Sequence, residues 1–71
     1  MNKKYHVFPP TISKKASING TRVKVGAFSI VENYVLLDCG TSEESKILIG
    51  QRCKIKQGAV LRTYDGRIEI G

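Results

Sequence analysis

Aliphatic residues recur along the chain at a spacing of six. The series contains Ile12 and Ile18, then Val25, Val31 and Leu37, and then Ile49, Ile55 and Leu61. An amphipathic helix repeats its apolar positions every 3.6 residues and a half-buried strand every two, so neither element explains a sustained period of six. A short strand followed by a sharp corner does, if each six residues form one side of a coil. The pattern therefore predicts short strands around a coil and no substantial helix.

Small or β-branched residues follow these aliphatic positions at a fixed distance. Four residues after an aliphatic position lie Ala16, Ser29, Val35, Thr41, Cys53 and Ala59. A side chain that points inward near a tight corner has little room, which excludes bulk at that position. We therefore expect these six residues to point into the coil.

One pentapeptide occurs three times with the pattern basic, aliphatic, any residue, aliphatic, glycine. The copies are residues 22–26 (RVKVG), 46–50 (KILIG) and 67–71 (RIEIG), so their starts lie 24 and then 21 residues apart. Self-similarity at this period is typical of stacked repeats. Polar, turn-rich stretches precede the second and third copies, at residues 38–46 and 63–66. We expect both stretches to project from the same edge of a solenoid.

The hexads in these stretches resemble a known repeat. Residues 49–54 (IGQRCK) and 55–60 (IKQGAV) are similar to the hexapeptide repeat of bacterial acyltransferases, whose hexads begin aliphatic-Gly and carry a small fifth residue. Residues 25–30 (VGAFSI) and 12–17 (ISKKAS) fit the same pattern. The resemblance covers residues 12–71, and residues 46–71 are most similar to the N-terminal part of a sugar O-acetyltransferase.

The resemblance implies an all-β fold, namely a short left-handed parallel β-helix with three hexads per coil and about three coils. Residues 12–71 would form this β-helix, and residues 1–11 an N-terminal arm or cap, because Pro9 and Pro10 are excluded from helices and central strands. The third pentapeptide closes the sequence, which suggests a repeat array truncated at its C-terminus. Its strand would then be an uncapped edge that presents Ile68 and Ile70.

Members of the resembled family transfer an acetyl group from acetyl-CoA, with a histidine as general base. The one histidine here is His6, in the arm before the repeats, and no family catalytic position maps onto it. We therefore assign no catalytic residue, leave the cofactor surface unassigned and the enzymatic status open, and expect no bound cofactor. The sequence favours a truncated relative of the O-acetyltransferases that is inactive alone and forms a homo-oligomer through its C-terminal edge strand.

Two other functions fit the sequence. The first is a non-catalytic β-helix module for assembly. The second is a small basic β-barrel that binds nucleic acid, which is less favoured because the six-residue period is left unexplained and the aromatic residues that would stack on bases do not cluster along the chain. We therefore expect no nucleic-acid partner.

The charge of the chain allows two interpretations. A formal net charge of +6 invites an anionic partner. Dispersed lysines and arginines also keep a small β protein soluble and protect its edges, and their spread in ones and twos favours this second interpretation. Two roles are open for five of the basic residues: they contact phosphates, or they form a solvated outer face of the coils. These residues are Arg22, Lys46, Arg52, Arg62 and Arg67. Likewise, Tyr64 and Asp65 either contact a ligand or neighbouring subunit, or shield the flank of a coil.

The cysteines and the hydropathy of the chain indicate its compartment. No apolar stretch approaches the ~20 residues that span a bilayer, and no apolar run follows the N-terminal lysines as in a secretory signal. We therefore expect a cytoplasmic protein without a membrane partner, in which Cys39 and Cys53 are reduced thiols rather than a disulfide. Neither cysteine belongs to a CxxC pair or lies near a histidine, so we predict no metal site.

Overall fold

The computed structural model describes residues 8–71, and the regular structure in this range consists of short β-strands. The strands are β1 (Thr11–Ile12), β2 (Ser17–Asn19), β3 (Val23–Val25), β4 (Ile30–Val31), β5 (Leu36–Asp38), β6 (Lys46–Ile49), β7 (Lys54–Ile55), β8 (Val60–Arg62) and β9 (Arg67–Ile70). No helix occurs among the described residues, as the sequence predicts.

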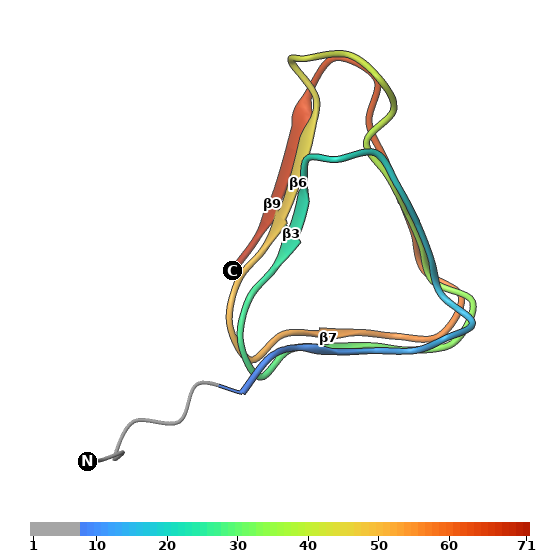
Figure 1. Cartoon of the computed structure of the whole chain (residues 1–71), viewed down its shortest axis with the longest axis vertical. Coiled ribbons are helices and arrows are strands. Elements are labelled where there is room, and N and C mark those ends of the chain that lie inside the picture. Colours follow the sequence, from blue (N-terminus) through green and yellow to red (C-terminus); the bar gives the residue numbers. More distant parts are fainter. Residues whose placement is uncertain (1–7) are drawn as a thin grey trace.

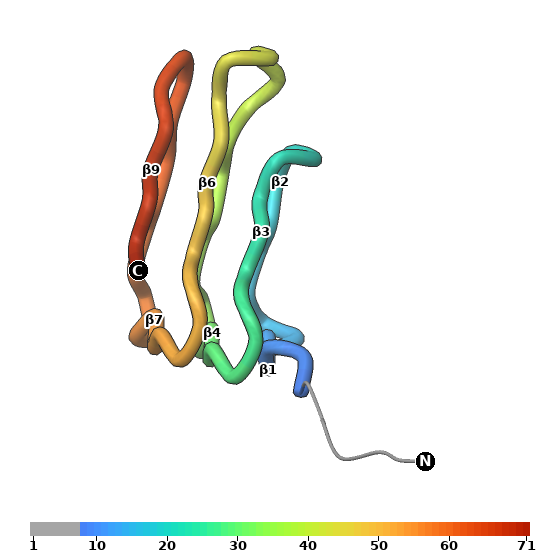
Figure 2. Tube along the Cα trace, turned by 90° about the vertical axis from the view of Figure 1, so that its left-hand side faces the viewer, coloured from blue at the N-terminus to red at the C-terminus, as the bar shows by residue number. Residues whose placement is uncertain are grey.

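The strands form three parallel sheets, with the orders β1-β4-β7, β2-β5-β8 and β3-β6-β9. Figure 1 shows that the chain turns around a triangle with one sheet on each side, and Figure 2 shows the turns stacked beside one another. The fold is therefore a short parallel β-helix of about three coils, namely β1–β3, β4–β6 and β7–β9. The left-handed sense of the coil stays a prediction. The β-barrel alternative is wrong, because a parallel sheet on each side of a coil is not the closed, largely antiparallel sheet of a small barrel.

The aliphatic residues of the sequence pattern stack on one another in the interior. Ile18, Leu37 and Leu61 are register partners on one side, and the other two sides have equivalent columns. The buried apolar core comprises Val31, Val35, Leu37, Cys39, Ile47, Ile49 and Ile55. Ile12 and Ile18 belong to the first coil and are each 39% exposed, because a second coil covers them from one side only among the described residues.

The small residues of the second pattern mostly point inward, as predicted. Ser29 and Val35 are buried, and Ala16, Cys53 and Ala59 pack against the core. The prediction for Thr41 is wrong, since Thr41 is exposed. It lies in the corner loop formed by residues 40–45, where the chain leaves the six-residue phase before β6 begins.

The three pentapeptides lie side by side as β3, β6 and β9 with the glycine that follows each strand. A Cβ atom on Gly26 would lie 2.6 Å from the carbonyl carbon of Gly50, so the backbones of the two coils approach too closely for a side chain. Gly50 in turn approaches Gly71, where the corresponding distance to its Cα is 3.2 Å. The glycine that ends each pentapeptide therefore marks one corner of the coil.

The two polar stretches lie at the corner that precedes β6 and β9, at the other end of the strands from the glycine column. Residues 40–45 and 63–66 both project beyond the corresponding corner of the first coil (Figure 1), as the sequence predicts. The Ser45 hydroxyl donates a hydrogen bond to the Tyr64 carbonyl, and the Lys46 amide donates to the Gly66 carbonyl at 3.1 Å. The loop of the second coil is longer, which explains the unequal spacing of the pentapeptides.

The described part of the N-terminal arm contacts the glycine corner. The Phe28 amide donates to the Phe8 carbonyl at 3.3 Å, and the two rings meet edge to face with their centroids 5.5 Å apart. Residues 1–7 of the predicted arm lie outside the described residues.

Candidate functional site

Two surfaces of the β-helix stand out, and both involve the sheet β3-β6-β9. The first is its outer face, which we call the basic face; it comprises the outward residues Arg22, Lys24, Lys46, Leu48, Arg67 and Glu69. The second is the open edge, which we define as the outer backbone of β7, β8 and β9.

The basic face places three cations in one column across the coils. Lys46 and Arg67 are register partners, and the Ile47 amide donates to the Arg22 carbonyl at 3.0 Å, which aligns Arg22 with Lys46. Side chains alternate along each strand, and Val23, Ile47 and Ile68 face the core, so the basic residue before each of them faces outward. Neighbouring strands lie about 4.8 Å apart, so the three basic residues follow one another at that interval.

One ion pair involves these cations among the described residues, although Glu43, Glu44 and Asp65 lie in the loops that lead into Lys46 and Arg67. Arg67 Nη1 lies 3.3 Å from Glu69 Oε2, but both side chains are more than half exposed, so the pair contributes little. Arg22 Nη1 donates to the neutral Ser42 carbonyl at 3.5 Å. Four basic residues and one carboxylate give the basic face a formal charge of +3. Residues 8–71, with ten basic and six acidic residues, carry +4.

The structure separates the other two predicted basic residues from this column. Arg62 lies on β8, and its Nε is 3.3 Å from Asp38 Oδ2 on the neighbouring strand. Arg52 lies at the glycine corner that adjoins the basic face, with its guanidinium carbon 4.8 Å from the centroid of the Phe28 ring. Three of the five predicted residues therefore share one column, and a fourth lies at the adjoining corner.

Tyr64 and Asp65 lie in the projecting loop before β9. Tyr64 is 75% exposed. A ring with so much accessible surface covers little of the flank of the coil. Of the two predicted roles, contact with a ligand or a neighbouring subunit is therefore favoured over shielding of the coil.

The open edge presents both backbone and apolar surface. In the second coil, Leu37, Ile47 and Ile49 are at most 3% exposed, whereas their partners Leu61, Ile68 and Ile70 in the third coil are only half-buried. The Lys46 amide donates to the carbonyl of Gly66, just before β9, and the Gly50 amide donates to the carbonyl of Ile70 in β9. Because donors alternate along a parallel ladder, the amides of Arg67 and Glu69 face away from β6, toward the open edge.

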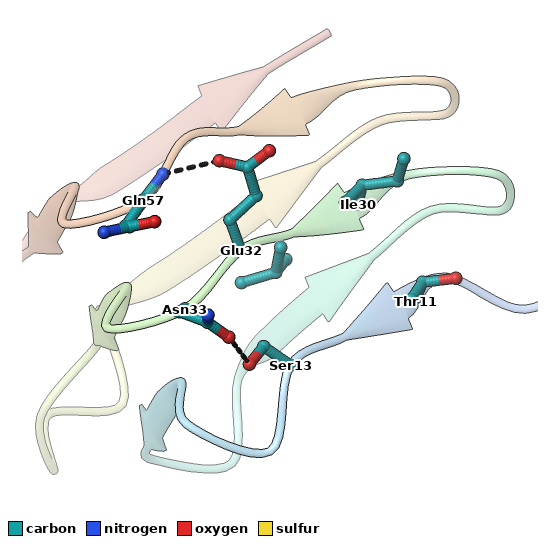
Figure 3. Close-up of a pocket in the computed structure, with 7 residues that line it drawn as sticks. Thr11, Ser13, Ile30, Glu32, Asn33 and Gln57 are labelled. Atoms are coloured by element: carbon teal, nitrogen blue, oxygen red, sulfur yellow. Dashed lines mark hydrogen bonds between the residues drawn. The ribbon is translucent and has the colours of Figure 1, made fainter.

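A separate open pocket of about 390 Å³ lies on the outer face of β1-β4-β7. Its polar groups bond across the coils (Figure 3): the Ser13 hydroxyl donates to Asn33 Oδ1, and the backbone N–H of Gln57 donates to Glu32 Oε1 at 2.8 Å. Glu32 Oε2 also lies 4.0 Å from Lys54 Nζ. These contacts join neighbouring coils. The sequence pattern did not predict this pocket, because no motif marks its residues.

Side chains that could bind a metal ion do not cluster in the described part of the chain. His6 lies outside the described residues. Within residues 8–71, no group of three or more histidine, cysteine, aspartate or glutamate side chains is placed to hold a metal ion. Cys39 is a buried free thiol and Cys53 a half-buried one. The same residues contain no helical segment with the length and apolarity that a bilayer crossing requires.

No family model matches the sequence, and no curated protein or solved structure matches it. Within residues 8–71, the chain is a parallel β-helix with a basic outer face, and no described strand covers the outer backbone of β7, β8 and β9.

Proposed function

We propose that this chain is a β-helix assembly module that pairs with a second copy through the open edge, and that it is a relative of the hexapeptide-repeat acyltransferases without acetyl transfer of its own. The observation that carries the proposal is the position of β7, β8 and β9, each of which is an edge strand of its sheet that no described strand covers on its outer side. Unpaired strand edges are templates for pairing with another chain.

The first coil of a second copy suits the open edge. Added as a further parallel coil, it would continue every interior column with aliphatic residues: Ile12 beyond Ile55, Ile18 beyond Leu61, and Val23 beyond Ile68. Lys24 of the second copy would then lie opposite Glu69 and Arg22 opposite Arg67, so one of these two register positions pairs opposite charges and the other pairs like charges. A head-to-tail contact of this kind builds open chains of copies rather than closed dimers.

The proposal is tested by sedimentation velocity over a range of concentrations with a proline variant of β9. Glu69→Pro removes an amide that faces the open edge and leaves the ladder to β6 intact, whereas Glu69→Ala removes the same carboxylate but keeps the amide. We expect the unsubstituted chain and Glu69→Ala to sediment as oligomers that grow with concentration, and Glu69→Pro to sediment as the 7.9 kDa monomer. A monomeric unsubstituted chain, or equal behaviour of the two variants, contradicts the proposal.

A second proposal concerns the origin of the chain. The in-register stacking of the hexads supports descent from enzymes that transfer acetyl groups. Three hexad-length sides per coil are what the resemblance to the O-acetyltransferases implies. A general base tuned near neutral pH is needed for such a transfer, and the single histidine precedes the coils. We therefore expect no release of free CoA from acetyl-CoA when the chain is supplied with sugar acceptors. Turnover above the uncatalysed rate would show that the chain is an enzyme.

We further propose a cytoplasmic location. The two free thiols support it, because disulfides predominate in oxidising compartments.

A further inference from the structure

We propose that the basic face binds the phosphate backbone of single-stranded nucleic acid. The face holds a formal charge of +3, three-quarters of the +4 carried by residues 8–71, although it is only one of three sides of the coil. Backbone binding by lysine and arginine depends on such a local concentration of charge.

The register of the coils concentrates like charges on this face. Like charges that lie directly opposite each other on neighbouring strands destabilise a sheet. Lys46 lies between Arg22 and Arg67 in the column, and its side chain is exposed. An anionic chain that crosses the strands along this column relieves the repulsion at all three positions. The parallel ladder holds the three Cα atoms in place, so little order is lost on binding.

Planar side chains lie at the two corners that bound the basic face and distinguish nucleic acid from other polyanions. At the corner next to the column, Tyr64 is 75% exposed and precedes Arg67 by three residues. At the glycine corner, beyond the C-terminal ends of β3 and β6, the exposed Arg52 stacks its guanidinium group on the Phe28 ring. Bases stack on aromatic rings and guanidinium planes, whereas a sulfated polysaccharide has no planar group to place there. The flat side of the coil carries no helix or ribbon that enters a major groove, which favours a single strand over a duplex.

This inference does not depend on the open edge. The basic face is the outer surface of a sheet, and pairing at the edge of that sheet leaves the outer surface accessible. Stacked copies would lengthen the column, because Arg22 of the next copy follows Arg67.

The test is fluorescence anisotropy with a labelled oligothymidylate of about 12 nucleotides, within the range of site sizes of single-strand-binding folds. Lys24→Gln/Lys46→Gln removes two charges from the basic face. Lys54→Gln/Lys56→Gln removes two exposed lysines from the β1-β4-β7 side and is the matched control. A second matched pair is Tyr64→Ala and Tyr34→Ala, since Tyr34 is also exposed but lies at another corner. Far-UV circular dichroism verifies that each variant is folded.

We expect Lys24→Gln/Lys46→Gln to weaken binding about tenfold and to reduce the slope of log K against log salt by about 1.4, since each lost phosphate contact contributes about 0.7. We expect Tyr64→Ala to weaken binding at least about fivefold, the lower end of the range for one stacked base. Both control variants should bind like the unsubstituted chain, and Glu69→Gln should bind more tightly.

Three results would overturn the inference. The first is an absence of oligothymidylate binding by the unsubstituted chain at low salt. The second is an equal loss in the two double-lysine variants, which would mean attraction by overall charge. The third is tighter binding of heparin than of the oligothymidylate together with unchanged binding by Tyr64→Ala, which would assign the face to a sulfated polymer.

Discussion

At the scale of single residues, the corners of the coil determine which side chains the chain tolerates. Ser29 is buried at the glycine corner, where its hydroxyl donates to the Gly50 carbonyl at 2.6 Å and accepts from the Cys53 amide at 3.0 Å. The sequence pattern predicted a small inward residue at this position. It did not predict that the hydroxyl joins the second coil to the third, because these partners become neighbours only once the coils stack.

Two glycines are required for different reasons, and replacing them should have different effects on stability. In Gly26→Ala the new Cβ meets the Gly50 backbone, which cannot move aside as a flexible side chain would. We expect a loss of about 3 kcal/mol, the upper end of the range for overpacking. In Gly58→Ala the Cβ meets no heavy atom within 4 Å, but φ is +82°, so we expect a loss of about 1–2 kcal/mol from the left-handed conformation alone.

Urea unfolding followed by circular dichroism measures both changes in the free energy of unfolding. Equal losses in the two alanine variants, or a larger loss in Gly58→Ala, would contradict the close approach of the coils at Gly26.

At the scale of elements, the strands were predictable and the corners were only partly so. The period of six places short strands correctly because the interior of the coil accepts aliphatic residues at fixed intervals. The left-handed backbone at Phe28, Tyr34 and Arg52, with φ between 57° and 64°, has no sequence signal, since bulky residues rarely adopt it. The polar stretch 63–66 did mark a corner, whereas the longer loop before β6 displaced Thr41 from the predicted phase.

The last strand shows how one element can serve two surfaces. Alternate side chains of β9 contribute Arg67 and Glu69 to the basic face and Ile68 and Ile70 to the interior, while its outer backbone forms part of the open edge. Glu69→Pro and Glu69→Ala change the same side chain, so their difference isolates the backbone contribution to assembly. Lys24→Gln/Lys46→Gln leaves that backbone unchanged and isolates the charge.

At the scale of the whole molecule, stacking converts separations of 24 and 21 residues into neighbouring positions. Arg22, Lys46 and Arg67 are far apart in the sequence, which made the basic residues look dispersed, although each begins a pentapeptide copy. The repeat therefore contained the column, but only the register of β3, β6 and β9 shows that the cations share a face. The pairing of Arg62 with Asp38 also depends on this stacking.

The central claim is that the open edge of the third coil pairs with a second copy. Residue-resolved amide hydrogen exchange, compared between dilute and concentrated protein, tests it most directly. The amides of Arg67 and Glu69 face the open edge, whereas those of Ile68 and Ile70 face β6. We predict that the two outward amides exchange quickly in dilute protein and become protected at high concentration, while the inward pair is protected in both. Unchanged, fast exchange of Arg67 and Glu69 at high concentration would contradict the claim.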